Sequence, residues 1–341
     1  MSSSSQPTDL ADLRTDLLGL VGEPTGSTAI NVIADRYLNK ALHDIHIDPG
    51  HNWPWASRRA YLVTHDDYTT GTVSITIATS RTAVTGVSTT WNTAATGYSF
   101  NNARAGGKIV FSGETDVYEV SSVTTDTALV LLNTYIGTAN LSGASYIYYE
   151  DEYALAADFL RPLDMRNFST DADIPFIGPM EFRRSYPRNS YRAKPKVATL
   201  FQLGFSGGTT PRYRVVLAPV PDANYSLPYD YITSYLAVSS AGTEQTQLSA
   251  TTDEPIIPLG FRHIISLRAA MDWLLFRKDD TRYTAVKGEF AELMQRMAGT
   301  SNIGQDRPRI RVNIGKYFGP YRMGRFDVGD RFDDLRDRRW R

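Results

Sequence analysis

Hydrophobic positions near the start of the chain recur at the spacing of two amphipathic helices. The first stretch follows Thr8, a suitable N-cap, stops at Gly22, and carries Leu10, Leu13, Leu17 and Leu20. The second starts near residue 27 and stops at the Pro49-Gly50 pair, and its apolar stripe is Ile30, Ile33, Tyr37, Leu38, Ala41, Leu42 and Ile45. The pattern predicts two helices joined by a short loop.

At residue 61 the pattern changes to short runs in which apolar and polar residues alternate. Five of these runs are TGTVSITIAT, KIVFSG, DVYEVSSV, TALVLLN and SYIYY, and turn residues separate them. About six strands without a helical period predict a small antiparallel barrel or sandwich over residues 61–150.

Residues 151–304 combine longer hairpins with two further helices. KVATLFQLGF and RYRVVLAPV predict a hairpin joined by the SGGTTP turn, and apolar stripes predict helices over 257–278 and 282–298. We expect the outward faces of these two helices to meet solvent, a channel or neighbouring chains. These faces carry Arg268, Asp272, Lys287, Glu292 and Arg296.

Together these elements predict an α+β fold. The first two and last two helices are expected to form a helical-bundle core, interrupted by an inserted small antiparallel β-barrel or sandwich and by additional β-hairpins. An extended C-terminal arm follows. The expected divisions are residues 1–60 and 151–304 for the two parts of the helical core, 61–150 for the inserted β module, and 305–341 for the arm.

Composition narrows the chemistry that is available. The chain has 341 residues, a formal net charge of −1 and no cysteine, which excludes disulfides, thiolate nucleophiles and cysteine-based zinc sites. The N-terminal MSSSSQPTDL has no apolar stretch typical of a signal peptide, and no apolar run is as long as a membrane helix. Residues 305–341 carry eleven Lys/Arg and six Asp/Glu, a local +5, so the first 304 residues carry −6.

Three of the five histidines, His43, His46 and His51, lie within nine residues. His43 and His46 have a helical spacing that can chelate zinc, but His51 lies beyond the Pro-Gly break. Neither an HExxH motif nor a Cys/His zinc spacing is present. Imidazoles in the last turn of a helix also interact favourably with its dipole. We interpret the stretch as a helix end and expect no metal and no cofactor.

Glu150, Asp151 and Glu152 have the proximity that glycoside hydrolysis requires of two carboxylates. An acidic cluster at the end of a strand is more typical of a solvated turn. The SGGTTP loop lacks the Gly-Lys-Ser/Thr arrangement that binds phosphate, and no GxSxG motif occurs. The chain is therefore predicted not to be an enzyme.

Several longer motifs follow one another in a specific order. HNWPWASRRA ends the second helix, and TAVTGVSTTWNTAATGYSF and KIVFSGETDVYEVSSVTTDTALVL build the β insertion. DEYALAADFLRP, VVLAPVPDANYSLPYDYITSYL and DEPIIPLGFRHIISLRAAMDWLLFRKDDTRY follow. This order resembles the head-to-tail adaptor proteins of tailed bacteriophages, also called neck or connector proteins. The resemblance covers roughly residues 27–300.

The resemblance implies a structural virion protein. Such adaptors form homo-oligomeric rings, typically dodecamers, beneath the portal protein, and they carry a channel for viral DNA and a docking surface for the next tail or neck protein. The implied location is the virion neck, after assembly in the cytoplasm of the host bacterium, with no membrane partner and no sequence-specific DNA binding. The family carries over no active-site residues. The matching Trp53, Trp55, Pro255, Pro258, Phe261 and Trp273 imply packing roles.

The arm at residues 305–341 sets aromatic side chains among arginines and glycines. Its Gly and Pro spacing excludes a long helix, and its apolar residues are too sparse for a separate core. A disordered tail and a nucleic-acid-binding arm are alternatives, although the six acids disfavour the latter. We predict an arm that orders on the portal or on a neighbouring adaptor subunit. Its candidate partner-binding residues are Arg309, Arg311, Tyr317, Phe318, Tyr321, Arg322, Phe326, Phe332 and Trp340.

Two other classes of function stay open at this point. A virion-associated cell-wall hydrolase needs two carboxylates about 5–10 Å apart in a groove, for which the acidic cluster is the candidate. A receptor- or glycan-binding fibre module predicts trimers and an exposed aromatic shelf. The adaptor interpretation predicts a ring instead.

Overall fold

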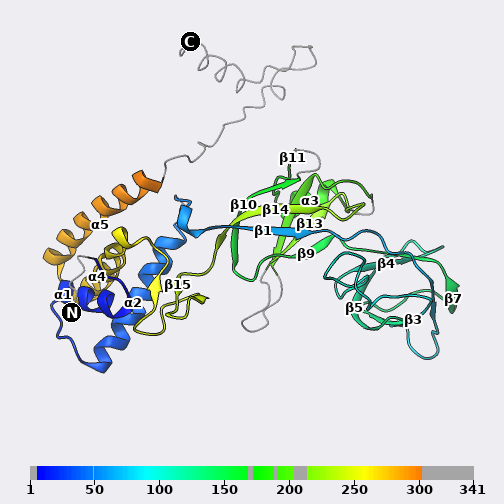
Figure 1. The fold of residues 1–341 in the computed structure, drawn as a ribbon, viewed down its shortest axis with the longest axis horizontal. Helices are drawn as coiled ribbons and strands as arrows, with labels where there is room; N and C mark the ends of the chain where they lie inside the picture. The colour runs from blue at the N-terminus through cyan, green and yellow to red at the C-terminus, as the bar shows by residue number, and fades with distance from the viewer. Residues whose placement is uncertain (1–5, 49, 168–171, 188–190, 203–212, 302–341) are drawn as a thin grey trace, which may run out of the picture.

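The computed structural model describes residues 6–48, 50–167, 172–187, 191–202 and 213–301. These residues form three regions that follow one another along the longest axis of the molecule (Figure 1). Helices occupy one end, packed strands the middle, and a separate sheet the other end. Within the described residues, no helix has the length and apolarity needed to cross a membrane.

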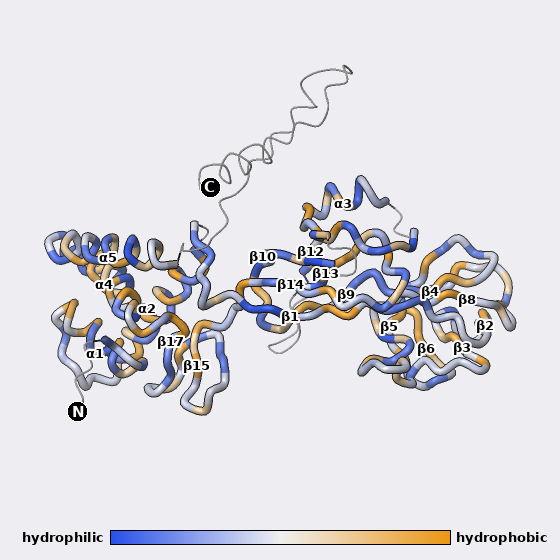
Figure 2. The backbone as a smooth tube through the Cα atoms, turned by 45° about the horizontal axis from the view of Figure 1, so that its top comes forward, coloured by the Kyte–Doolittle hydropathy of each residue, from blue (hydrophilic) through white to orange (hydrophobic). Residues whose placement is uncertain are grey.

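We name the three regions by their residues. The helical region comprises residues 6–56 and 234–301, the central region residues 57–67 and 150–233, and the distal module residues 68–149. Each region buries an apolar cluster of its own. Figure 2 agrees, because hydrophobic segments occur in all three regions and not in the helical end alone.

Four α-helices build the helical region, namely α1 (Leu10–Val21), α2 (Thr28–His46), α4 (His263–Arg277) and α5 (Asp280–Ser301). The short 3₁₀ helices are η1 (Pro54–Ala56) and η2 (Leu259–Phe261). The helical region also contains a three-stranded sheet. Its strand order is β16 (Glu244–Gln245), β15 (Ala237–Val238) and β17 (Glu254–Pro255). Four elements that the periodicity of the sequence predicts as helices are therefore present as helices.

The ends of α1 follow from its sequence, with one correction. Asp9, and not the predicted Thr8, is the N-cap, because its carboxylate accepts a hydrogen bond from the backbone N–H of Asp12 at 3.0 Å. The Thr8 hydroxyl donates to the Asp12 carboxylate at 2.6 Å. Gly22 ends the helix at φ 71°, a left-handed conformation that glycine adopts without a steric penalty.

The central region contains two antiparallel sheets. The first has the order β1 (Ser57–Val63), β14 (Ser226–Thr233), β10 (Phe159–Asn167) and β11 (Ala172–Asp173). The second has the order β12 (Val197–Gln202), β13 (Tyr213–Ala218) and β9 (Glu152–Ala154), and the short helix α3 (Pro179–Ser185) packs against β12.

The distal module is one antiparallel seven-stranded sheet. Its order is β7 (Leu141–Ala144), β2 (Thr72–Ile75), β3 (Ala83–Val87), β6 (Ala128–Leu131), β5 (Tyr118–Thr125), β4 (Lys108–Phe111) and β8 (Tyr146–Tyr149). Alternate residues are buried in β2, β3, β4 and β6, as Ile109 and Phe111 are in β4. The sheet therefore has one apolar face, as its alternating sequence predicts.

The chain segments that lead into and out of the distal module contact each other. The Tyr153 hydroxyl accepts a hydrogen bond from the backbone N–H of His65 at 3.1 Å. The same hydroxyl donates to the carbonyl oxygen of Glu150 at 2.9 Å. The module is thus attached to the central region by two adjacent passages of the chain.

The predicted helical-bundle core is wrong. Among the described residues the protein is mostly β, with seventeen strands in four antiparallel sheets, and the four long helices occupy one end only. Helical periodicity is a strong local signal, whereas the pairing of β1 with β14 joins residues 57–63 to residues 226–233. Long-range strand pairing of this kind builds the central region, and no local sequence pattern predicts which strands will pair.

Candidate functional site

The three clustered histidines do not form a common site. The His46 side chain is buried, and its Nε2 donates to the carbonyl oxygen of Thr233 at 2.6 Å. His51 pairs with Asp48, with Nδ1 2.9 Å from Oδ2, and stacks on Trp53. Among the described residues, no group of three or more His, Cys, Asp or Glu side chains is placed to hold a metal ion. This stretch is the end of α2, anchored to β14.

The acidic cluster between β8 and β9 is not the solvated turn that its sequence predicts. Glu150 and Asp151 are only 4% and 3% exposed. Each carboxylate meets a cation from the distal module, since Arg104 Nε donates to Glu150 at 3.0 Å and Lys108 Nζ donates to Asp151 at 2.6 Å. Glu152 accepts a longer bond from Lys108 at 3.2 Å. The cluster is a buried ionic contact between two regions.

Burial and charge act in opposite directions on the two cations. Burial alone would lower the pKa of Lys108, but the charges of Asp151 and Glu152 outweigh it and raise the pKa above its ordinary value. The pKa of Arg104 is raised beside Glu150 for the same reason. Both cations therefore stay charged at neutral pH, and the carboxylates serve as their partners. Buried pairs of this kind are costly to break from one side.

The incoming passage, which leads from β1 into the distal module, carries a third ion pair. Asp67 pairs with Arg192, whose guanidinium lies 4.4 Å from the centroid of the Tyr149 ring. Burial raises the pKa of the Asp67 carboxyl, against the opposing effect of Arg192. Both chain passages therefore have ionic contacts. We call this set the ionic junction, and it consists of Asp67, Arg104, Lys108, Glu150, Asp151, Glu152 and Arg192.

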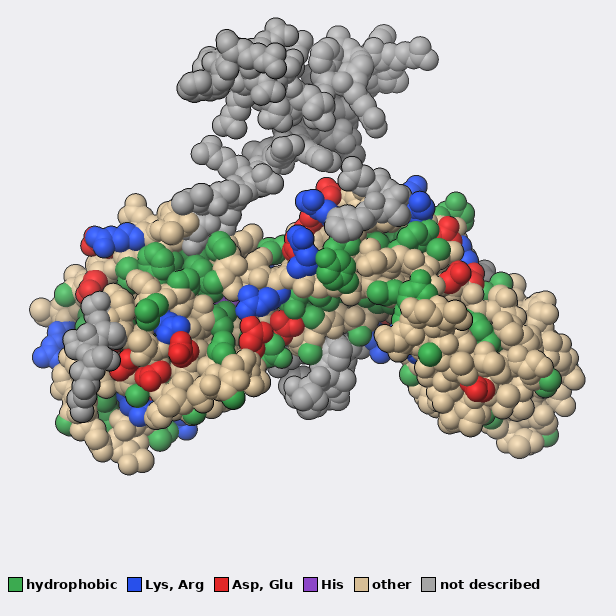
Figure 3. Space-filling model, in the orientation of Figure 1, with side chains coloured by type: hydrophobic (Ala, Val, Ile, Leu, Met, Phe, Trp, Pro, Cys, Tyr) green, Lys and Arg blue, Asp and Glu red, His purple; other side chains and the backbone are tan. Residues whose placement is uncertain are grey.

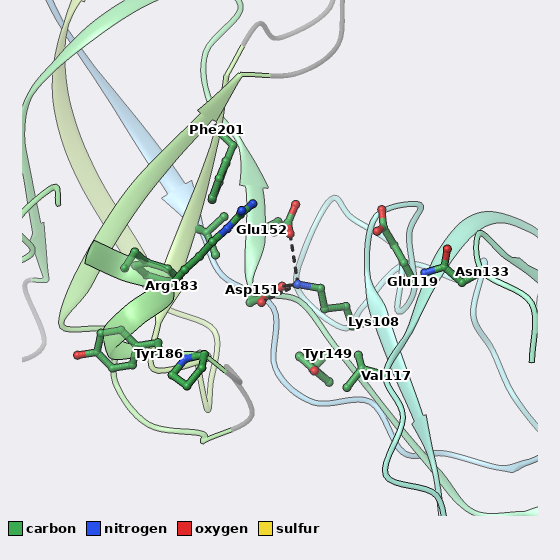
Figure 4. A pocket seen from close by; sticks show the side chains of 13 residues that line it. Lys108, Val117, Glu119, Asn133, Tyr149, Asp151, Glu152, Arg183, Tyr186 and Phe201 are labelled. Atoms are coloured by element: carbon green, nitrogen blue, oxygen red, sulfur yellow. Dashed lines mark hydrogen bonds and ion pairs between the residues drawn. The ribbon is translucent and has the colours of Figure 1, made fainter. Parts of the chain in front are cut away.

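A cleft of about 430 Å³ opens beside the ionic junction, between the module and the α3–β12 side of the central region (Figure 4). Lys108 lies in it and is held by Asp151 and Glu152. Arg183 lies over the Phe201 ring, 5.3 Å from its centroid. The described residues that line the cleft include no Ser, Thr, Cys or His. The Ser–His and Cys–His pairs of acyl-transfer enzymes are therefore not among these lining residues.

A second, smaller crevice of about 210 Å³ lies beside the incoming passage, whose residues His65 to Tyr68 line it. Its main aromatic feature is Tyr98, which is 38% exposed and stacks on Phe100 with ring centroids 4.9 Å apart. The Arg104 guanidinium lies 4.9 Å from the Phe100 centroid, and Asp66 and Asn102 also line the crevice. The crevice thus combines an aromatic stack with carboxylate and amide groups.

The charged side chains predicted to face outward on the last two helices differ in their surroundings: those of α4 contact α2, whereas those of α5 are exposed. Arg268 donates to Asp272 at 2.6 Å and to Asp44 of α2 at 2.9 Å, and Lys40 of α2 also pairs with Asp272. These four side chains connect α2 to α4, because their partners lie on the facing helix. They are half-buried or exposed, but they are engaged within the chain.

The charged face of α5 is exposed. Arg296 pairs with Glu292 one turn earlier, and the Lys287 ammonium lies 6.0 Å from the centroid of the Tyr283 ring. The arm follows α5 in the sequence. The predicted partner-binding residues, from Arg309 to Trp340, lie outside the described residues, and their roles stay predictions.

No protein-family model matches the chain, and no curated protein matches it. Functional inference therefore depends on the geometry described above and on the order of the motifs.

Sequence reasoning missed the cations of the ionic junction. Arg104 and Lys108 are 46 and 43 residues away from their partners along the chain, so no short-range pattern links them. One signal was available, because Lys108 begins the alternating strand KIVF and pairs in register with Tyr149, next to the acids. Using that signal requires knowledge that β4 and β8 are neighbours.

Proposed function

We propose that this chain is a non-enzymatic structural subunit of the head-to-tail adaptor type, which assembles as a ring beneath the portal of a tailed bacteriophage. In this proposal the ring gives viral DNA a channel, and its far side receives the next tail or neck protein. The order of motifs over residues 27–300 is the basis for the adaptor class. The arm supplies contacts to the portal or to a neighbouring subunit.

The arrangement of the three regions along one axis is the observation that carries this proposal. A subunit that joins two assemblies needs contact surfaces that lie far apart and a firm connection between them. The helical region and the distal module lie at opposite ends of the molecule (Figure 1). The ionic junction braces the connection between the module and the central region, because it places ion pairs on both chain passages.

Exposed apolar side chains at both ends also support an assembly role. Leu275 and Phe276, at the end of α4, are 61% and 79% exposed. In the distal module, Leu132 and Ile136 are 58% and 65% exposed. Apolar side chains exposed in groups are typical of interaction surfaces. Figure 3 shows charged side chains gathered over the helical and central regions, while the visible face of the module has few of them.

The state of the acidic cluster favours a structural role over hydrolysis. A glycosidase needs one carboxyl group that can donate a proton and a second one that is free to act. Asp151 and Glu152 instead share Lys108, and Glu150 is held by Arg104. A turbidity assay on purified cell walls tests this point directly. Clearing that is lost in an Asp151→Asn variant would support the hydrolase.

Assembly is the direct test of the adaptor proposal. Native mass spectrometry and negative-stain imaging of the purified full chain should show a large cyclic oligomer, alone or when portal rings are added. Co-sedimentation with portal-bearing capsids should retain the chain, and capsids without a portal are the matched control. A chain that stays monomeric at high concentration and also fails to sediment with portal-bearing capsids would overturn the proposal.

The aromatic crevice favours glycan binding as a second candidate function. The exposed stack of Tyr98 on Phe100 is the kind of shelf that a receptor-binding module requires, and Asp66 and Asn102 supply hydrogen-bonding groups beside it. A glycan array probed with the full chain tests this candidate, with Tyr98→Ala as the matched variant. Binding that Tyr98→Ala abolishes, together with a trimeric wild-type chain, would favour the fibre module over the adaptor.

A further inference from the structure

The central region has an open sheet edge. β1 is the outer strand of its sheet and pairs with β14 only, so no described strand lies along its other side. An open edge presents a row of backbone donors and acceptors to any extended segment that can pair with it. Arg59 and Tyr61 of β1 are exposed, Tyr61 by 62%.

The register shows which backbone groups of β1 face outward. Thr64 N donates to the carbonyl oxygen of Tyr225 at 2.9 Å, so this pair is hydrogen-bonded. Antiparallel pairs alternate between hydrogen-bonded and non-hydrogen-bonded positions, which makes Tyr61 and its partner Pro228 a non-hydrogen-bonded pair. Pro228 has no N–H, in agreement with this assignment. The backbone groups of Arg59, Tyr61 and Val63 therefore point toward the open edge.

The arm contains one segment with the pattern of a strand. Residues 309–314 read RIRVNI, with Ile310, Val312 and Ile314 alternating with polar side chains. Pro308 precedes the segment and Gly315 follows it, and these residue types bound strands. The segment is six residues long, close in length to the seven-residue strand β1. A single six-residue strand cannot bury its apolar face by itself, so it requires a sheet with which to pair.

We propose that residues 309–314 of one copy add as an edge strand to β1 of a neighbouring copy. This inference rests on the proposed ring, and it specifies how part of the arm holds adjacent subunits together. The apolar row of the segment would lie on the side of Ala60 and Leu62, which belong to the core of the central region. Its arginines would lie on the opposite face with the exposed Tyr61 ring, a suitable partner for a guanidinium.

Charge and position support this occupant. The segment 305–341 carries +5 and the preceding 304 residues carry −6, so the arm is attracted to the body of another copy. The last turn of α5 lies near the chain that leads into β1 (Figures 1 and 2). Copies related by a ring axis lie at the same height along that axis. An arm that leaves one copy beside the start of β1 therefore meets the next copy at the level of its β1.

Proline substitutions in the full-length chain test the contact from both sides. Tyr61→Pro removes an outward N–H and leaves the bonds between β1 and β14 in place, because proline is tolerated at such edge positions. Val312→Pro disrupts the segment in the arm without changing the central region. Tyr61→Ala is the matched control that shortens the side chain but keeps the backbone donor. Circular dichroism and thermal unfolding check that each variant is folded.

Sedimentation velocity and native mass spectrometry then measure assembly, in solution or, if wild type assembles only there, as occupancy on portal-bearing capsids. We expect Tyr61→Pro and Val312→Pro each to lower the assembled fraction at least tenfold, and Tyr61→Ala to retain most of it. An equimolar mixture of the two proline variants should form one-to-one dimers, because only one intact edge and one intact segment can meet.

The outcomes separate this inference from the proposed function. Wild-type rings formed by either proline variant would overturn the strand addition and leave the ring itself standing. A mixture that shows no dimers would overturn the exchange between copies. A wild-type chain that neither assembles nor binds the portal would overturn the adaptor proposal, and the strand addition between copies would fall with it.

Discussion

The helical region and the distal module bury cores of different chemistry. Of the twenty-six buried residues in the core of the helical region, two are aromatic, namely Trp53 and Trp273. In the distal module six of fourteen are aromatic, and three of these are Tyr135, Tyr146 and Tyr148. Helices satisfy their own backbone groups and pack closely through small and aliphatic residues. The module fills its interior with fewer, larger side chains, so buried hydroxyls there need partners.

The module meets this requirement with side-chain hydrogen bonds. Trp91 Nε1 donates to the Tyr146 hydroxyl at 2.9 Å, and that hydroxyl donates to the carbonyl oxygen of Thr70 at 2.7 Å. Burial raises the pKa of both Tyr146 and Tyr148. These hydroxyls therefore stay protonated and act as donors. The stability of the module should depend on hydrogen bonds, and that of the helical region mainly on apolar volume.

The largest effect is expected in the helical region, at Trp53. Its side chain is 1% exposed, stacks on Trp55, and donates from Nε1 to the carbonyl oxygen of Ile45 at 2.8 Å. Trp53→Ala should lower the free energy of unfolding by about 4 kcal/mol, because it leaves a large cavity. Urea unfolding followed by far-UV circular dichroism measures the loss. Trp53→Phe, which retains most of the volume, should lose clearly less, and equal losses would contradict a volume-based core.

The next effect concerns the ionic junction between the distal module and the central region. Lys108→Ala leaves Asp151 buried without its main partner and should lower the free energy of unfolding by about 3 kcal/mol. The double variant Lys108→Ala/Asp151→Ala should recover part of this loss, because it removes both charges. Arg214→Ala is a suitable control, since its pair with Glu152 is 3.5 Å long. A double variant that is less stable than Lys108→Ala would count against the buried-charge explanation.

A smaller loss of stability is expected when a buried hydroxyl is removed from the core of the distal module. The Tyr148 hydroxyl accepts from the backbone N–H of Arg104 at 2.8 Å and donates to Glu150 Oε1 at 2.7 Å. Tyr148→Phe leaves both groups without this partner and should lower the free energy of unfolding by about 2 kcal/mol. Tyr61→Phe, at a 62% exposed ring, is the matched control and should be neutral. Equal stability of the two variants would refute the hydroxyl argument.

The same contrast explains how much of the fold the sequence predicts. The four long helices follow from their apolar periodicity, because the helical period is local and the stops at Gly22 and Pro49 are explicit. The alternating runs of the module predict strands for a similar reason. The overall class was predicted wrongly, since β1, β10 and β14 come from three distant parts of the chain and their pairing leaves no local trace.

The candidate site shows the same limit at the level of side chains. Three consecutive acids indicate a solvated turn when they are considered alone. Their burial depends on Arg104 and Lys108, which the pairing of β4 with β8 brings to them from more than forty residues away. The helix-end interpretation of the histidines needed only Pro49 and Gly50, which lie next to them in the sequence. Local signals were sufficient in that case.

The smallest expected effect is a change in the pH dependence of stability, caused by His46 in the helical region. Burial lowers its pKa below the ordinary 6.5, and the nearby charges of His43, Arg161 and Arg58 act in the same direction. As the pH falls below about 6.5, the unfolded chain therefore binds a proton before the folded chain does. Stability should decrease over that window, until the pH falls below the folded pKa.

His46→Gln keeps a donor for the carbonyl oxygen of Thr233 and removes the titration. Its free energy of unfolding should decrease less than that of wild type between about pH 7 and about pH 5. His263→Gln is the matched control, because the hydrogen bond that His263 donates to the Asp16 carboxylate raises the pKa of His263. The contribution of His263 is present below its unfolded pKa and lost as the pH rises through its folded pKa, so its removal should change the slope in the opposite sense. Parallel pH profiles for wild type and His46→Gln would show that the buried imidazole contributes nothing to the acid sensitivity of the helical region.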